Sequence, residues 1–186
     1  MSRFIIGNLP LASPKLVERQ RLGDRRGWFS RLFCAEELSA AGWVGPIAQI
    51  NHTYTVRRGT VRGMHFQHPP HAEIKLVSCL RGEVFDVVVD LRRNSPSFLK
   101  WHGEVLSADN QRSLLVPEGF AHGFQTLADD CELLYLHSAP HTPAAEGALN
   151  PTDPRLAIAW PLAIAELSDR DRAHPMLGSD YQGIAQ

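Results

Sequence analysis

The amino-acid sequence predicts a single, mainly β domain, either a sandwich or a barrel, from three observations. Short apolar or β-branched runs recur between Gly, Pro and Asn residues, as in proteins built from many short strands. The chain has 186 residues, 44% of them hydrophobic, which suffices for one core in a domain of ordinary size. Helical periodicity is scarce. We therefore expect residues 1–186 to form one domain.

Seven strands are expected, at residues 28–33, 60–66, 74–80, 84–91, 98–106, 112–116 and 133–137. One short helix is expected over residues 35–41, where Gly42 is a suitable residue to end it. Gly82 separates two apolar strands and predicts a tight turn, and thus a hairpin.

The remaining segments carry turn and loop residues. Residues 94–97 and 108–110 are rich in Asn, Ser, Asp and Pro, which favour turns. The Pro-rich stretch over residues 139–154 is expected to be a long surface loop.

Charge and composition exclude several function classes. The chain has 19 Lys and Arg against 20 Asp and Glu, so it lacks the positive field that holds nucleic acid or an anionic membrane. Residues 1–15 lack the pattern of a secretory signal. The longest apolar run, residues 156–165, is about half the length that spans a bilayer and contains Pro161. We expect no membrane span and no nucleic-acid partner.

The three cysteines point to a reducing compartment. Cys34, Cys79 and Cys131 are an odd number without CxxC spacing, and they lie in apolar or strand-like surroundings. Buried free thiols are therefore expected, and the predicted location is the cytoplasm.

Two of the nine histidines stand out, His65 and His122. His65 lies in the strand-like segment 61–67. Because side chains alternate along a strand, Arg62 would share a face with Met64 and not with His65 if the strand were regular. His122 follows Pro117 and Gly119 with PxGxxH spacing. A strand histidine bonded to a backbone carbonyl is the structural alternative for His122.

The PxGxxH spacing resembles the second motif of the cupin superfamily of small β-barrels. Metal-binding cupins carry an HxH pair in their first motif, whereas this chain has His65-Phe66-Gln67 at the matching place. Because a metal site needs several converging ligands, we predict no metal.

Six segments in order resemble the dTDP-4-dehydrorhamnose 3,5-epimerase family, and the resemblance runs from about Leu16 to Pro175. They are residues 23–29 (GDRRGWF), 62–67 (RGMHFQ), 75–77 (KLV), 82–92 (GEVFDVVVDLR), 117–124 (PEGFAHGF) and 167–171 (LSDRD). The resemblance implies a cupin-like double-stranded β-helix, that is, a jelly-roll barrel with a few short helices. It also implies a homodimer in which N-terminal segments are exchanged.

The implied activity is cofactor-free inversion of carbons 3 and 5 in a nucleotide-linked 4-keto-6-deoxyhexose, from dTDP-4-dehydro-6-deoxyglucose to dTDP-4-dehydrorhamnose. Such a step would feed carbohydrate biosynthesis, for example of lipopolysaccharide or O-antigen. Protons beside a ketone are acidified by enolate formation, so the enzyme needs a base on one face, an acid on the other and a donor near the carbonyl oxygen.

The resemblance assigns roles residue by residue. His65 matches the base, Asp171 the carboxylate that orients it, Lys75 a cation near the enolate oxygen, and Tyr135 the acid on the opposite face. The implied substrate-binding residues are Arg26, Arg62 and Arg170 for the diphosphate, and Gln49, Asn51, His122, His141 and Glu146 elsewhere in the pocket.

Each role has a plainer alternative when the local sequence is taken alone. Asp171 would be an exposed charge in a mixed-charge run, Tyr135 a core aromatic, and Lys75 a solvated strand lysine. The three arginines would be ordinary surface groups.

Three departures from the family pattern fall on the nucleotide side. Arg31 stands where the family usually has a glutamate, and Ile50 replaces the aspartate of a Gln-Asp-Asn triplet. The family's YKTTDYY run becomes YLHSAPH over residues 135–141, so His141 would replace the aromatic residue that stacks on thymine.

These departures leave alternatives open. One is an epimerase of carbon 3 or carbon 5 alone, or one acting on a CDP- or GDP-linked sugar. Another is a non-catalytic cupin that binds sugar nucleotides. A third is a metal-dependent cupin oxygenase or isomerase.

Overall fold

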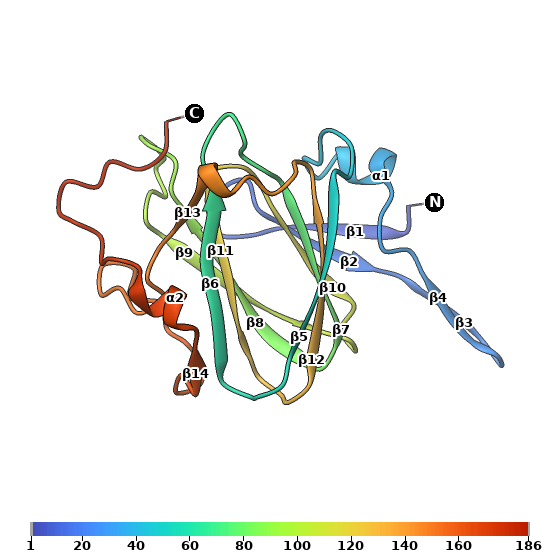
Figure 1. Cartoon of the computed structure of the whole chain (residues 1–186). Coiled ribbons are helices and arrows are strands. Elements are labelled where there is room, and N and C mark those ends of the chain that lie inside the picture. Colours follow the sequence, from blue (N-terminus) through green and yellow to red (C-terminus); the bar gives the residue numbers. More distant parts are fainter. Residues whose placement is uncertain (1, 186) are drawn as a thin grey trace.

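The protein, described over residues 2–185 by a computed structural model, consists of two facing β-sheets that close into a barrel and a two-stranded arm, β3 (Arg21–Asp24) and β4 (Gly27–Ser30), that projects from it (Figure 1). The first sheet has the order β1 (Phe4–Asn8), β2 (Lys15–Arg19), β10 (Arg112–Val116), β7 (Lys75–Arg81), β12 (Cys131–His137) and β5 (Gln49–Thr55). The second has the order β13 (Glu146–Ala148), β6 (Thr60–Gln67), β11 (Phe120–Thr126), β8 (Glu83–Asp90) and β9 (Trp101–Ser107), with β14 (Glu166–Leu167) also beside β6.

The pairing is nested, which confirms the expected jelly roll. β5 pairs with β12, β6 with β11, β7 with β10, and β8 with β9, all antiparallel. A long two-stranded ribbon wound on itself gives this pattern, in which most strands pair with partners distant in sequence.

The prediction of a hairpin at Gly82 is wrong. β7 and β8 meet at this glycine but belong to different sheets, so the turn is a corner of the barrel. Gly82 is required at this corner because its φ is +76° and an added Cβ would lie 2.7 Å from Sγ of Cys131.

Other expected elements hold with shifted ends. The helix is α1 (Ala35–Ser39), and β10 has the expected bounds, while β4 (Gly27–Ser30) ends earlier than expected and β9 starts later. The stretch 139–154 is not only a loop, because it contains the 3₁₀ helix η1 (Pro143–Ala145) and β13, which covers part of one edge of β6. The elements that were not among those expected are β1, β2, β3 (Arg21–Asp24), β5, β11, β14 and α2 (Asp169–Ala173).

Three apolar clusters hold the two sheets. The central cluster lies between them and includes Val77, Val88 and Leu133. α1 and neighbouring residues cover the outer face of the first sheet, where Leu38 packs near Leu76. Residues C-terminal to β13 cover the outer face of the second sheet. The barrel is therefore filled by apolar side chains in one part, and polar side chains occupy the rest.

A β-bulge in β6 resolves the parity of Arg62 and His65. His65 lies opposite His122 and Arg62 opposite Phe124, so two residues of β6 face the single residue Gly123 of β11. This extra residue turns both Arg62 and His65 toward the interior of the barrel.

Gly63 and Gly123 make this bulge possible by their close approach. Gly63 has a φ of +126°, and an added Cβ would lie 2.5 Å from Cα of Gly123. An added Cβ at Gly123 would lie 2.7 Å from the backbone oxygen of Arg62. Only glycine fits at either position.

We expect Gly63→Ala to lower the free energy of unfolding by about 1–3 kcal/mol, because the added methyl group strains the positive-φ backbone and clashes with β11. Gly7→Ala is a matched control within a strand, since its Cβ would lie an ordinary 3.5 Å from Cβ of Leu16. Urea unfolding measures both variants. Equal stability of the two would contradict the role assigned to the bulge.

Candidate active site

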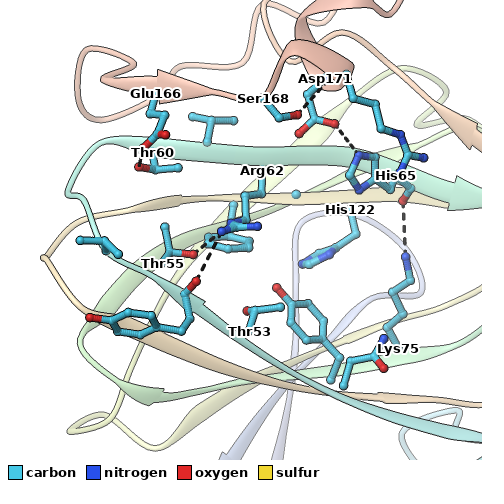
Figure 2. A pocket seen from close by; sticks show the side chains of 18 of the residues that line it. Thr53, Thr55, Thr60, Arg62, His65, Lys75, His122, Glu166, Ser168 and Asp171 are labelled. Carbon is cyan, nitrogen blue, oxygen red and sulfur yellow. Dashed lines mark hydrogen bonds and ion pairs between the residues drawn. The ribbon is translucent and has the colours of Figure 1, made fainter.

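The interior of the barrel holds a cavity of about 550 Å³, joined to a second of about 330 Å³ (Figure 2). Four residues line both: Asn51, His65, Lys75 and His137. Eleven of the twelve site residues expected from the sequence line one cavity or both, and Arg26 is the exception. The fold thus collects residues that are spread over more than a hundred positions.

His65 and Asp171 form a hydrogen-bonded pair at the wall of the larger cavity. Nε2 of His65 lies 2.7 Å from Oδ1 of Asp171, which α2 carries. The backbone N–H of Gly63 donates to Oδ2 at 3.3 Å, so the bulge also holds the carboxylate. Ser168 caps α2, because its Oγ accepts from the backbone N–H of Asp171 at 3.0 Å.

The environment of Asp171 keeps it ionised. Burial by itself would raise the pKa of this carboxyl, but the hydrogen bond and charge of His65 and the N–H of Gly63 together hold the pKa below its usual value. Its side chain is only 5% exposed, so the alternative of a solvated surface charge is wrong.

Lys75 is a buried lysine at the start of β7, so the alternative of a solvated strand lysine is also wrong. Its Nζ donates to the backbone oxygen of His65 at 3.5 Å and lies 3.1 Å from Oε1 of Glu73. The ammonium group is therefore held between the Glu73 carboxylate and the backbone carbonyl of His65.

Tyr135 lies deep in the cavity on β12, where its ring also joins the central apolar cluster. Burial raises the pKa of its phenol, so the hydroxyl keeps its proton. The alternative of a core aromatic describes its packing, but the residue also lines the cavity.

His122 lies beside Tyr135, with ring centroids 6.0 Å apart. Its Nε2 is 2.9 Å from both carboxylate oxygens of Asp86, so this nitrogen bonds to a side chain instead of the backbone carbonyl of the structural alternative. Complete burial raises the pKa of Asp86, although His122 and then Lys75 oppose the rise.

The expected binding residues surround this centre. Nε of Arg62 donates to Oγ1 of Thr55 at 3.0 Å, which directs the guanidinium along the larger cavity. Arg170, on α2, pairs with Glu146 of β13 at the rim, and these two residues line the larger and the smaller cavity respectively. Gln49 and His141 line the smaller cavity.

Arg26 is not brought to the site within one chain. It lies in the turn of the β3–β4 arm, which projects away from the barrel (Figure 1), and pairs with Asp24 at 2.6 Å. Arg31 pairs with Glu37 of α1, and Ile50 points outward from β5 with 58% exposure. Neither of these departures from the family pattern lines a cavity in this chain.

Sequence reasoning missed five residues that support the site: Thr55, Glu73, Asp86, His137 and Ser168. The Ser-x-x-Asp spacing before Asp171 was a helix-capping signal. Asp86 is a charged residue within the apolar run of β8, and this position was a signal that it has a special role. Glu73 and His137 gave none, because their contact depends on the register between β7 and β12.

One group of possible metal ligands occurs among residues 2–185: His65, Asp171 and His174 lie with ligand atoms within 4.8 Å of one another. Nε2 of His174 is 3.9 Å from Oδ1 of Asp171, beyond hydrogen-bond distance. His65 and Asp171 already bond to each other, and the ring of His122 turns to Asp86.

Comparisons with known proteins agree with this geometry. The sequence model of the family described as dTDP-4-dehydrorhamnose 3,5-epimerase matches residues 8–179. A relative of that name from Salmonella typhimurium is 41% identical over 87% of this chain and 89% of its own length. A dTDP-4-dehydrorhamnose 3-epimerase from Streptomyces niveus is 41% identical over 84% of this chain and 75% of its own length.

A solved structure agrees as well. The dTDP-6-deoxy-D-glucose-3,5-epimerase of Legionella pneumophila, in complex with dTDP-4-keto-L-rhamnose, superposes with a TM-score of 0.91 at 35% identity, over 98% of this chain and 99% of that one. The similarity thus extends over nearly the whole barrel.

Asp171→Asn should reduce the free energy of unfolding at pH 7 by about 1–3 kcal/mol, because it removes a buried ionised acceptor. The folded protein holds the pKa of Asp171 below its usual value. The ionised carboxylate therefore stabilises the fold at pH values above the usual carboxyl pKa, and this stabilisation is lost as the pH falls through the pKa of Asp171 in the folded protein. The difference in free energy of unfolding between wild type and variant should therefore become smaller in acid. Urea unfolding at pH 7, 5 and 3 measures it, and a constant gap would argue against an ionised, stabilising Asp171.

Proposed function

The chain belongs to the dTDP-4-dehydrorhamnose 3,5-epimerase family and is thus an isomerase of a nucleotide-linked 4-keto sugar, and we propose that His65 and Tyr135 carry out its proton transfers. The observation that supports this most is the meeting of a carboxylate-oriented imidazole, a buried ammonium and a protonated phenol in one cavity. Inversion beside a ketone requires these three groups.

In the proposed reaction, His65 takes the proton from carbon 3 or carbon 5, and the C–H electrons move into the carbonyl to form an enolate. Asp171 stabilises the imidazolium that results, and Lys75 faces the oxygen on which negative charge develops. Tyr135 then donates its proton to the same carbon from the other face. Solvent returns a proton to Tyr135 and takes one from His65, which restores the enzyme without a redox cofactor.

The remaining predicted residues would hold the rest of the substrate. We propose that the guanidinium groups of Arg62 and Arg170 bind the diphosphate, for which their planar donors are suited. Gln49, Asn51, Glu146 and His141 offer donors and acceptors around the smaller cavity. His122, held by Asp86, would support the phenol of Tyr135 from the side.

Inversion of carbon 3 alone is the second candidate. The specific observation in its favour is that the Streptomyces niveus relative, named as a 3-epimerase, matches this chain at 41% identity, as the Salmonella typhimurium 3,5-epimerase does. The choice between one carbon and two is therefore an outcome of the test below.

We further propose a homodimer in the cytoplasm. The β3–β4 arm exposes the rings of Trp28 and Phe29, each 58% exposed, and Arg26 lies at the turn between its strands. An apolar arm that projects from the barrel is suited to packing on a second copy, where Arg26 would complete the neighbouring site. The free cysteines fit a reducing compartment, and no helix within residues 2–185 is long and apolar enough to cross a membrane.

Proton NMR in deuterium oxide with dTDP-4-keto-6-deoxyglucose tests the proposed function. Wild type should exchange the protons at carbons 3 and 5, and a coupled reductase should trap the product. His65→Ala should slow exchange by roughly a hundredfold to ten-thousandfold. Tyr135→Phe should retain some exchange but impair inversion.

His52→Ala is the matched control, because His52 pairs with Glu132 outside both cavities. Exchange at one carbon only would indicate the mono-epimerase. If wild type exchanges neither proton, the same assay with CDP- and GDP-linked 4-keto sugars separates a different substrate from a binding protein. Normal turnover by His65→Ala would refute the assignment of the base.

Mixing two inactive variants tests the arm exchange. His65→Ala and Arg26→Ala subunits, each defective alone, should regain activity after mixing, because one site of each mixed dimer combines an intact barrel with an intact arm. Random mixing gives roughly one intact site in four. No recovery, together with mixed dimers seen by mass spectrometry, would show that Arg26 does not act across the interface.

A further inference from the structure

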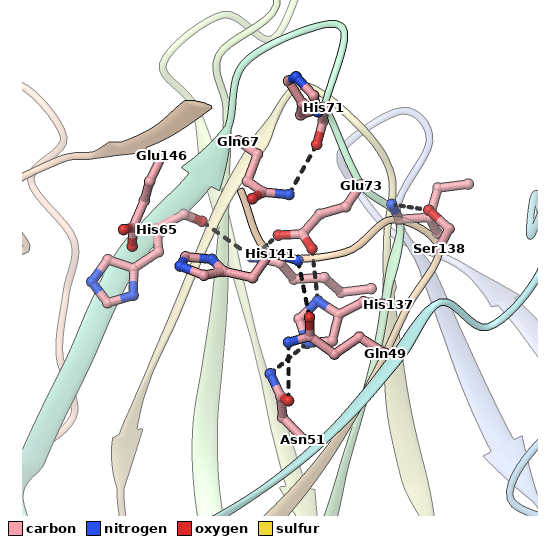
Figure 3. A network of polar contacts seen from close by, with 12 residues as sticks. Gln49, Asn51, His65, Gln67, His71, Glu73, His137, Ser138, His141 and Glu146 are labelled. Atoms are coloured by element: carbon pink, nitrogen blue, oxygen red, sulfur yellow. Dashed lines mark hydrogen bonds and ion pairs between the residues drawn. The ribbon is translucent and has the colours of Figure 1, made fainter. Parts of the chain in front are cut away.

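A continuous chain of hydrogen bonds crosses the smaller cavity from His141 to Glu73 (Figure 3), and Glu73 is ion-paired with Lys75. We call it the Glu73–His137 network, and its members are Gln49, Asn51, Glu73, Lys75, His137 and His141. Gln49, His137 and Lys75 stand side by side on β5, β12 and β7, because Gln49 pairs with His137 and His137 with Lys75. The strand register therefore builds this network.

The direction of each hydrogen bond follows from a backbone donor at one end. The N–H of His141 donates to Oε1 of Gln49 at 2.9 Å, so Nε2 of Gln49 donates to Oδ1 of Asn51 at 3.0 Å. Nδ2 of Asn51 is then left to face Nε2 of His137 at 3.3 Å. An amide nitrogen only donates, so Nε2 of His137 accepts and carries no proton.

The other ring nitrogen of His137 must then carry the proton. Nδ1 lies 2.7 Å from Oε2 of Glu73 and donates to it. The second oxygen of the same carboxylate, Oε1, is 3.1 Å from Nζ of Lys75. Glu73 is thus shared between a neutral imidazole and an ammonium group.

All three side chains are buried, with exposures of 8% for Glu73, 9% for Lys75 and 10% for His137. Burial would raise the pKa of Glu73, but the hydrogen bond from His137 and the charge of Lys75 hold the pKa below its usual value. The carboxylate is therefore charged, and it compensates a charged lysine in a place that solvent scarcely reaches.

We propose that Glu73 and His137 are positioning residues that fix Nζ of Lys75 beside the reacting carbonyl. Glu73 supplies the counter-charge that a buried ammonium group requires. His137 binds the second oxygen of Glu73 and so holds the carboxylate in place beside Lys75. With one N–H of Lys75 directed at Glu73 and one at the backbone oxygen of His65, the third is left for the substrate. The inference rests on the proposed function, in which Lys75 faces the enolate.

Five other titratable groups face Lys75. Glu73 comes from the loop just before β7, His137 and Tyr135 come from β12, His65 comes from β6, and Asp86 comes from β8. Glu73 is the one carboxylate among residues 2–185 that is ion-paired with Lys75. Its replacement should therefore act mainly through Lys75.

Glu73→Gln tests the charge. The variant keeps the shape and hydrogen-bonding reach of the side chain but removes the counter-charge beside Nζ of Lys75. At pH 7 we expect kcat to fall about tenfold or more, with KM changed less, since a donor to the developing oxyanion is weakened. An unchanged kcat would overturn the charge role.

Two isosteric changes at His137 test the positioning. His137→Asn keeps a donor where Nδ1 lies, whereas His137→Gln keeps reach toward Asn51 and loses that donor. We expect His137→Asn to lose at most about threefold in kcat and His137→Gln to lose about tenfold. Equal losses in both would show that His137 only fills space.

An activity-independent measurement separates this inference from the proposed function. Long-range ¹H–¹⁵N NMR of the histidine rings in the full chain at pH 7 should show His137 with its proton on Nδ1 alone, and Glu73→Gln should shift that Nδ1 resonance. A proton on Nε2 would overturn the network even in an active enzyme. Wild type that is inactive on every 4-keto sugar, but has the expected tautomer, would refute the proposed function and leave the network standing.

Discussion

The close approach of Gly63 to Gly123 is the constraint on which the site depends. Without side chains at these two positions, β6 can accommodate one extra residue against β11. That residue changes the alternation of the strand, so Arg62 and His65 face the same interior although three positions separate them. The same bulge directs the N–H of Gly63 at Asp171. A regular strand would send either the arginine or the histidine outward.

Three histidines that line the cavities are each paired with a carboxylate. His65 bonds to Asp171, His122 to Asp86, and His137 to Glu73. The carboxylates come from α2, β8 and the loop before β7, and each fixes one ring nitrogen of its histidine. Unpaired, these groups would be costly to bury, so the pairs stabilise the fold and prepare the chemistry together.

The rest of the barrel supplies rigidity and reach. The central apolar cluster continues up to the ring of Tyr135, so the phenol is held by the packing that joins the two sheets. α2 lies against β6 and brings Asp171 to the cavity from the outside, with Ser168 as its cap. The β3–β4 arm, by contrast, leaves the rings of Trp28 and Phe29 exposed and carries Arg26 away from the site, which is why a second copy enters the proposal.

The sequence by itself determined the fold class, the family and nearly all of the residues around the cavity. Alternating runs bounded by turn residues are a local property of strands, and six ordered segments are specific enough to identify a family. Local sequence does not encode which strands pair, because pairing depends on contacts distant in the chain. The hairpin expected at Gly82 failed for this reason, and so did the assignment of residues 139–154 as a loop.

Only the tertiary structure decided how the side chains face one another. It buried Asp171, which the local sequence describes as one charge among several, and it turned Arg62 and His65 to the same side. It also placed Glu73 and His137 beside Lys75 through the register of β7 and β12, which no local pattern reveals. Residue types therefore limit the chemistry that is available, but the protonation and position of each group depend on neighbours that only the folded chain brings together.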